Sequence, residues 1–161
     1  MKALVTGGAG FIGSHLAEAL CLRGAKVIVV DNLSLGKTAN LDWKRNGDEL
    51  EFVRADISDE PLMKQLVRDC DWIFHEAAMP SVPISVAEPV ETNTQNLDAT
   101  LNLLVLARDA GVKRFLFASS SAIYGDSDAS AKNECLPPQP LSPYALQKYG
   151  AEKYGQLFHQ L

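Results

Sequence analysis

A tyrosine and a lysine stand four residues apart near the carboxyl end of the sequence, at Tyr144 and Lys148. On a helix, this spacing places both side chains on one face. The pKa of a free phenol is about 10, so a phenolate at neutral pH costs about 4 kcal/mol. An ammonium group about 4 Å away, at an effective dielectric constant of about 20, supplies about 4 kcal/mol. The pair therefore predicts a general base, although the spacing alone is more typical of an exposed amphipathic helix.

Two further features support the catalytic interpretation. Ser120 follows an apolar run, and its hydroxyl can hydrogen-bond a substrate hydroxyl and hold it near the base. Gly7, Gly10 and Gly13 lie between a short apolar run and a helical pattern. Such a loop lets the backbone approach a pyrophosphate, whereas the alternative is a plain tight turn. Together these residues predict redox chemistry at a carbinol carbon, with hydride transfer to a bound nicotinamide dinucleotide.

Two aspartates follow apolar runs and concern the cofactor. Asp31 ends the second run, 18 residues after Gly13. A carboxylate there accepts hydrogen bonds from the adenosine ribose and repels a 2′-phosphate, so it favours NAD over NADP. The alternative is an aspartate that only forms the turn at Asp31-Asn32. Asp56 follows the third run and either meets the adenine or caps the next helix.

Strand and helix patterns alternate along the chain. Short apolar runs predict strands at 3–6, 27–30, 51–55, 72–75 and 114–118, and helical patterns lie at 12–22, 61–68 and 92–110. Ser142 and Pro143 are a typical N-cap and first helical residue, and the helix that they begin is predicted to continue to Leu161. This alternation predicts an α/β fold, a Rossmann-type doubly wound parallel sheet. The loop at 125–141 follows the last strand, where such folds bind ligands.

The composition excludes several function classes. The 161 residues are 47% hydrophobic and 22% charged, as in an ordinary globular domain. The net charge of −5 and the lack of a basic run argue against nucleic acid as a partner. Cys21, Cys70 and Cys135 are an odd, scattered set, which predicts reduced thiols in a cytoplasmic protein and no disulfide framework. The sequence has no signal peptide and no apolar stretch that could span a bilayer, so no membrane partner is expected. His15, His75 and His159 lack metal-ligand spacing, so no metal is expected, and His75 is expected to be packed.

Taken together, the motifs resemble those of the extended short-chain dehydrogenase/reductases. The resemblance is to their NAD-dependent nucleotide-sugar epimerase/dehydratase group, most of all the UDP-N-acetylglucosamine and UDP-glucose 4-epimerases. The matching segments are Thr6-Gly7-Gly8-Ala9-Gly10-Phe11-Ile12-Gly13, Asp31-Asn32-Leu33-Ser34, Asp56-Ile57, His75-Glu76-Ala77-Ala78, Ser119-Ser120-Ser121-Ala122-Ile123-Tyr124-Gly125 and Ser142-Pro143-Tyr144-Ala145-Leu146-Gln147-Lys148.

The resemblance implies roles for individual residues. It makes Ser120, Tyr144 and Lys148 the catalytic residues, of which Tyr144 and Lys148 also contact the NAD cofactor. Further NAD contacts are implied for Gly7, Gly10, Phe11, Ile12, Gly13, Asp31, Asn32, Ser34, Asp56, Ile57, Ala77 and Asn96. Contacts to the sugar are implied for Ser81, Ser120, Ser121 and Tyr144.

The resemblance also implies a reaction, NAD-dependent epimerisation at C4 of a UDP-sugar through a 4-keto intermediate. Dehydratases of the group carry Thr-Asp-Glu where this chain has Ser120-Ser121-Ala122, so the acid for a leaving hydroxyl is missing. Ser81-Val82-Pro83-Ile84-Ser85, with Glu88-Pro89, resembles the 4-epimerases. A dehydratase, decarboxylase or reductase on the same frame and a catalytically silent NAD-binding fragment stay open as alternatives.

Family members are longer than this chain. The resemblance therefore implies that residues 1–161 are an incomplete NAD-binding Rossmann domain, cut before the last strands, and that the carboxyl-terminal UDP-sugar domain is absent. It also implies a homodimer for the full-length enzyme.

Overall fold

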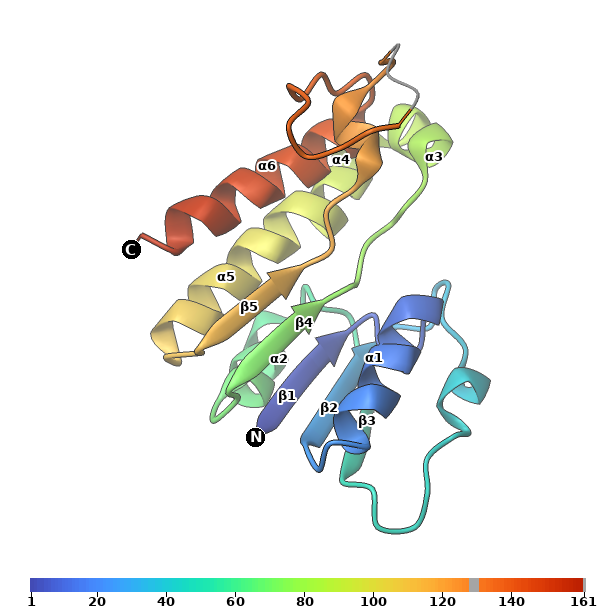
Figure 1. Ribbon diagram of the computed structural model, residues 1–161, viewed down its shortest axis with the longest axis vertical. Coiled ribbons are helices and arrows are strands. Elements are labelled where there is room, and N and C mark those ends of the chain that lie inside the picture. Colours follow the sequence, from blue (N-terminus) through green and yellow to red (C-terminus); the bar gives the residue numbers. More distant parts are fainter. Residues whose placement is uncertain (128–130, 161) are drawn as a thin grey trace. The chain divides into compact units, whose positions relative to one another are not determined.

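The computed structural model describes residues 1–127 and 131–160 (Figure 1). The chain forms two compact units. The first unit comprises Met1–Ala77 and Asn102–Ala118, and the second comprises Ala78–Leu101 and Ser119–Leu161. The predicted loop at 125–141 includes residues 128–130, which lie outside the described residues.

The first unit contains a parallel sheet whose strands match the predicted ones to within one residue at most ends. Within the described residues the sheet has five strands in the order β3-β2-β1-β4-β5. Their bounds are Lys2–Thr6 (β1), Lys26–Asp31 (β2), Leu50–Arg54 (β3), Trp72–His75 (β4) and Arg114–Phe117 (β5). Val5 pairs with Val29 on one side and Phe74 on the other. This order confirms the Rossmann-type fold. The order in which the chain adds strands to the sheet reverses between β1 and β4, and such folds bind ligands at this point.

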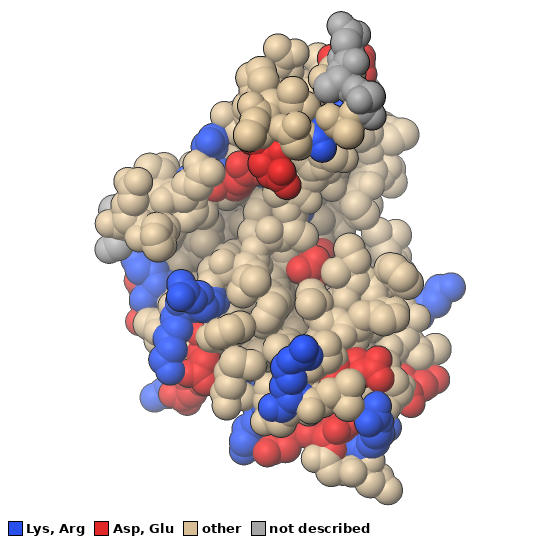
Figure 2. All heavy atoms as spheres, in the orientation of Figure 1, with Lys and Arg blue, Asp and Glu red and all other residues tan. Residues whose placement is uncertain are grey.

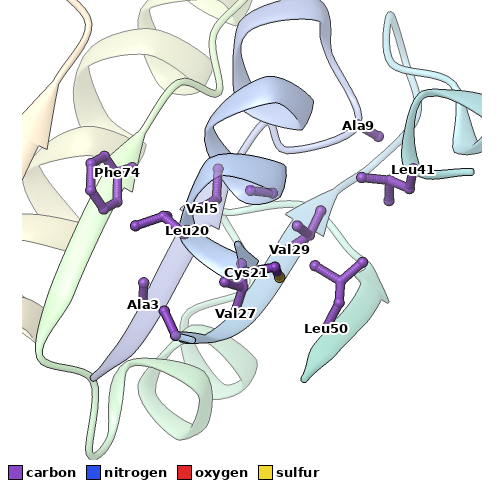
Figure 3. Close-up of a cluster of buried hydrophobic side chains, with 12 residues drawn as sticks. Ala3, Val5, Ala9, Leu20, Cys21, Val27, Val29, Leu41, Leu50 and Phe74 are labelled. Carbon is purple, nitrogen blue, oxygen red and sulfur yellow. The ribbon is translucent and has the colours of Figure 1, made fainter. Parts of the chain in front are cut away.

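Helices cover both faces of this sheet, so each strand alternates between two cores. On one face, helix α1 (Phe11–Cys21) covers Ala3, Val5 and their neighbours, as Figure 3 shows. On the other face, Leu4 joins a second cluster with α2 (Glu60–Val67) and α5 (Ala99–Asp109). Burial on both faces explains why the strands are continuous apolar runs in the sequence.

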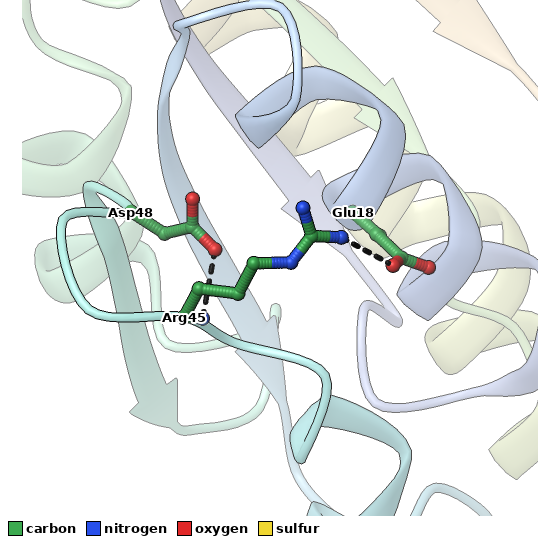
Figure 4. A network of polar contacts seen from close by, with 3 residues as sticks. All are labelled: Glu18, Arg45 and Asp48. Carbon is green, nitrogen blue, oxygen red and sulfur yellow. Dashed lines mark hydrogen bonds and ion pairs between the residues drawn. The ribbon is translucent and has the colours of Figure 1, made fainter.

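The connection between β2 and β3 is held against α1. It contains a short 3₁₀ helix, η1 (Thr38–Leu41). The Arg45 guanidinium lies 3.5 Å from Glu18 Oε1, and the Arg45 N–H donates to Asp48 Oδ2 (Figure 4). An exposed ion pair of this kind contributes only about 0.2–1 kcal/mol. Packing of Leu41 and Trp43 against the α1 core therefore contributes more to holding this segment.

The second unit carries helices that the sequence only partly revealed. Within its described residues it contains α3 (Val82–Ala87), α4 (Pro89–Asn93), the π-helical turn η2 (Thr94–Asp98), the 3₁₀ helix η3 (Ser121–Tyr124) and α6 (Pro143–Phe158). The single helix predicted at 92–110 is wrong in detail, because η2 separates α4 from α5. The predicted end of the last helix, Leu161, lies outside the described residues, and α6 ends at Phe158.

Charged side chains of both signs occur on the described surface. On the face shown in Figure 2, Lys and Arg side chains lie among Asp and Glu side chains. No helix in the described part is both long and apolar enough to cross a membrane.

Burial raises the pKa of the free thiols of Cys21 and Cys70, which therefore stay protonated near neutral pH. His75 is fully buried with its Nδ1 2.6 Å from Thr6 Oγ1, so it is packed as predicted.

Candidate active site

The glycine loop packs so closely against neighbouring backbone that side chains at Gly7 and Gly13 are excluded. Gly7 has a φ of +66°, and a Cβ there would lie 2.6 Å from the Ala77 nitrogen. A Cβ on Gly13 would overlap the Gly7 carbonyl oxygen. These glycines therefore let the end of β1 turn tightly into α1. A plain surface turn would not require such close contacts with neighbouring backbone.

Helix α1 begins directly after this loop with its first N–H groups unshielded. Gly10 is the N-cap, and in the described residues no side chain caps the helix. Phe11 is 80% exposed and Ile12 is 60% exposed. An uncapped amino end that carries a partial positive charge fits a pyrophosphate, so the loop and α1 fit an NAD cofactor.

Asp31 ends β2 and its carboxylate is already engaged with the loops around it. Its Oδ2 accepts a hydrogen bond from the Ala9 N–H at 3.0 Å, and its Oδ1 accepts from the Leu33 N–H at 2.8 Å. The turn-forming alternative is thus realised, and the carboxylate also holds the glycine loop. Each carboxylate oxygen can accept a second hydrogen bond, so the ribose contact stays a prediction that this geometry allows.

Asn32 and Asp56 join the ends of β2 and β3. Asn32 Nδ2 donates to Asp56 Oδ2 at 2.8 Å, and Asn32 Oδ1 accepts from the Ser34 N–H at 2.9 Å. Burial raises the pKa of Asp56, but hydrogen bonds from Ser58 and Asn32 outweigh it and hold the pKa below its usual range. These residues form a polar rim at the carboxyl edge of the sheet, where the adenosine contacts are predicted.

The helix-cap alternative for Asp56 is wrong. Asp59 caps α2 instead, because its Oδ1 accepts from the Leu62 N–H at 3.1 Å. Ile57 is half-buried and packs against the second core cluster. Ala77 follows β4, and its N–H donates to Thr6 Oγ1 at 3.4 Å. Contacts of Ile57 and Ala77 to a cofactor remain predictions.

Tyr144 and Lys148 lie on the buried face of α6. Tyr144 is 9% exposed and Lys148 is 3% exposed, together with Gln147 and Ala151 on the same face. This burial excludes the alternative of an exposed amphipathic face. A lysine buried to this degree is uncommon outside functional sites, because the ammonium loses its hydration.

The start of α6 is held by two serine hydroxyls. Ser142 is the predicted N-cap, and its Oγ accepts from the Ala145 N–H at 3.1 Å. Ser85, a fully buried residue of α3, accepts from the Tyr144 N–H at 3.0 Å. These bonds satisfy N–H groups that a helix leaves open at its start. They fix the backbone that carries the Tyr144 phenol.

Ser120 lies in the same unit as Tyr144 and Lys148. It is the N-cap of η3, where its Oγ accepts from the Ala122 N–H at 3.2 Å, and η3 packs against α6. The Ser120 hydroxyl proton is not used by this cap bond, because the oxygen is the acceptor. Ser121 is exposed.

Tyr124 is a second tyrosine of this unit and is not a rival base. Burial, reinforced by the carboxylates of Glu134 and Glu152, raises the pKa of Tyr124. The side chain therefore stays a phenol near neutral pH.

The remaining sugar and cofactor candidates of this unit have structural partners. Ser81 caps α3, because its Oγ accepts from the Ile84 N–H at 3.3 Å. Asn96 Oδ1 accepts from the Met79 N–H at 2.7 Å, while its Nδ2 donates to Met79 O at 3.2 Å and to Gln147 Oε1 at 2.8 Å. The amide hydrogens of Asn96 are therefore used within the protein, and its cofactor contact remains a prediction.

Sequence reasoning missed Ser85 and Gln147, which hold α6 in place. For Gln147 a signal was present, because it lies three residues after Tyr144 and hence on the same helix face. Ser85 lies in the segment Ser81-Val82-Pro83-Ile84-Ser85, but nothing in that segment indicated its role, because its contact with α6 spans 59 positions of the sequence.

The chain is similar in sequence to known proteins of one family. Residues 3–160 match the NAD dependent epimerase/dehydratase family. The chain is 43% identical to a UDP-glucose 4-epimerase of Mycolicibacterium smegmatis, over 90% of this chain and 47% of that protein. It is 42% identical to UDP-glucuronic acid decarboxylase 4 of Arabidopsis thaliana, over 78% of this chain and 27% of that protein.

A solved structure extends the similarity to the fold. The UDP-N-acetylglucosamine 4-epimerase of Methanobrevibacter ruminantium, in complex with UDP-N-acetylmuramic acid, superposes with a TM-score of 0.91 at 42% identity. The match covers 99% of this chain and 50% of that one, so the chain spans about half the length of this relative. With the family matched along nearly all of its residues, the chain belongs to the NAD-dependent epimerase/dehydratase family.

Proposed function

We propose that this chain is the NAD-binding part of a UDP-sugar 4-epimerase. The observation that carries the proposal is the burial of Tyr144 and Lys148 on one face of α6, in the unit that also holds Ser120. The relatives named UDP-glucose and UDP-N-acetylglucosamine 4-epimerases support the substrate class.

The proposed chemistry divides between the cofactor and three side chains. Bound NAD would supply a hydride acceptor for the sugar C4 carbon and, once reduced, a donor to either face of the ketone. Tyr144 Oη takes the proton of the 4-hydroxyl as the 4-keto sugar forms, and it returns the proton when the alcohol is restored. Lys148 stabilises the phenolate by its charge, and Ser120 donates a hydrogen bond to the reacting oxygen.

The chain supplies only part of this machinery in the proposal. It spans 47% of the Mycolicibacterium relative, so we propose that contacts to the UDP group come from residues outside this chain. Remote contacts of this kind orient the reacting carbon. The full-length protein is proposed to be a cytoplasmic homodimer, as the family resemblance implies.

Decarboxylation of a UDP-glucuronate is the second candidate, because a decarboxylase is among the similar proteins. Both reactions begin with oxidation at C4, so the same three side chains would serve them. Dehydration is disfavoured, because Ser121 and Ala122 provide no acid for a leaving hydroxyl.

Product analysis distinguishes these reactions. The full-length protein is incubated with NAD and, separately, with UDP-glucose, UDP-N-acetylglucosamine and UDP-glucuronate, and the products are identified by NMR. The expected result is the 4-epimer of one of the first two substrates with no net change in NAD. If release of carbon dioxide from UDP-glucuronate is the only reaction observed, the epimerase proposal is refuted and the decarboxylase proposal takes its place.

Cofactor choice is expected to depend on Asp31. In calorimetric titrations the protein should bind NAD more tightly than NADP, because the carboxylate repels a 2′-phosphate. Asp31→Ala should narrow the difference between the affinities for NAD and NADP. It should also lower the affinity for NAD, since the Ala9 N–H loses its acceptor. The exposed Asp42, changed to alanine, is the control and should leave both affinities unchanged. Equal affinities for NAD and NADP in the parent protein would refute this assignment.

A further inference from the structure

A buried polar chain links α6 to the π-helical turn η2 and to α4. Gln147 Oε1 accepts from Asn96 Nδ2 at 2.8 Å, and Gln147 Nε2 donates to Thr92 Oγ1 at 3.1 Å. The side chains of Thr92, Asn96 and Gln147 are almost completely buried. All three belong to the second unit. In an interior that excludes water, such bonds restrict geometry strongly, because the alternative is an unpaired polar group.

The two partners of Gln147 are themselves anchored. Asn96 is held by both the N–H and the carbonyl oxygen of Met79. Thr92 Oγ1 donates to Glu88 O at 3.0 Å. Gln147 therefore connects α6 to points on two other segments whose positions are already set.

Gln147 lies between the residues that are proposed to do the chemistry. It precedes Lys148 and follows Tyr144 by three positions, and all three are buried on one face of α6. A rotation or shift of α6 would move the phenol and the ammonium together. Ser85 holds the helix start, and further on Gly150 packs against Leu97, where a Cβ would lie 3.3 Å from the Leu97 side chain. Between Ser85 and Gly150, Gln147 holds α6 through hydrogen bonds, which depend on direction.

Loss of this tie should not unfold the unit. Without the Gln147 amide, Asn96 Nδ2 still donates to Met79 O, and Thr92 Oγ1 still donates to Glu88 O. An apolar side chain of similar length could fill the volume, but it could not select one rotation of the helix, because dispersion contacts are not directional.

We propose that Gln147 is a positioning residue, whose buried amide sets the rotation of α6 and thereby the placement of the Tyr144 phenol and the Lys148 ammonium. The inference rests on the proposed function, because it assumes that this pair carries the proton transfer. Neither the glycine loop nor Asp31 takes part in it, so the contacts predicted for the pyrophosphate and the adenosine are expected to be independent of Gln147, and only the contact assigned to Lys148 should move with α6.

The test uses Gln147→Leu and Gln147→Met in the full-length protein, with Gln156→Leu as the matched control. Gln156 lies on the same helix but is exposed, and its Oε1 accepts from Lys153 Nζ at 3.0 Å. The two Gln147 variants should lower kcat by on the order of 100-fold, because a misplaced reacting group costs about that much. The KM for the UDP-sugar should change by less than about twofold, which marks a loss confined to the chemical step, and the calorimetric affinity for NAD should fall by no more than it does in Lys148→Met. Gln156→Leu should behave as the parent.

The outcomes separate this inference from the proposed function. If Tyr144→Phe is inactive but both Gln147 variants keep the parent kcat, the positioning role is refuted and the function stands. If kcat, KM and NAD affinity all deteriorate together with a lowered Tm in both variants, Gln147 is merely structural and the inference is again overturned. If Tyr144→Phe keeps the parent rate, the proposed function is refuted, and the inference that rests on it is refuted as well.

Discussion

Replacing Tyr144 by phenylalanine in the full-length protein is expected to lower kcat by on the order of 100- to 10,000-fold, which is the range for a positioned acid–base group. The substitution removes one oxygen from a buried ring and leaves the ring itself in place. The Tyr144 backbone N–H still donates to Ser85, so the start of α6 should be unchanged. NAD affinity, measured by calorimetry, should fall little, since the glycine loop holds the pyrophosphate.

The same helix offers a control for this experiment. Tyr149 lies on α6 with its ring 5.2 Å from the Lys153 ammonium, and Tyr149→Phe should keep the parent rate. Lys148→Met should lose activity as well and should weaken NAD binding, because the lysine is assigned a contact to the cofactor. A near-normal rate for Tyr144→Phe would refute the assignment of the base.

The second large effect is expected at the glycine loop. Gly7→Ala should lower the free energy of unfolding by about 2–5 kcal/mol, because a side chain at positive φ is strained and the new Cβ meets the Ala77 backbone. The loop must shift to relieve this contact, so NAD binding should become undetectable by calorimetry even where the protein remains folded. Urea unfolding of the full-length protein measures the change in stability.

A matched substitution separates the two causes of this loss. Gly24 has a φ of +74°, but a Cβ at this position would meet no atom within 4 Å. Gly24→Ala should therefore show only the conformational strain, about 1–2 kcal/mol, with NAD affinity unchanged. An equal loss of stability in both variants, with NAD still bound by Gly7→Ala, would contradict the close-approach argument.

The sequence alone determined features that depend on neighbouring residues. Apolar runs and helical periodicity predicted the strands of the sheet, helices α1 and α2 and the start of α6 to within one residue, because period and capping are local properties. Ser142 was recognised as the N-cap of α6 for the same reason. The spacing of Tyr144 and Lys148, with the glycine loop, likewise indicated the chemistry, because residue type and spacing are written in the chain itself.

Several features of the site were decided only by tertiary structure. The choice between an exposed and a buried face for Tyr144 and Lys148 depends on what packs against α6, and the spacing is the same in both cases. The π-helical turn at Thr94–Asp98 interrupts a sequence whose periodicity predicts one helix. Its residue Asn96 is held by Met79 and Gln147, which lie 17 and 51 positions away in the sequence.

Small polar residues show most clearly why local reasoning stops there. Asp56 and Asp59 are both plausible caps for α2, and only the backbone geometry assigns the cap to Asp59. Ser85 and Gln147 lie in segments that resemble the family but had no role assigned to them, yet they hold the helix that bears the proposed base. A hydrogen bond between distant segments depends on where the chain brings them in space, and side-chain type and spacing do not encode that position.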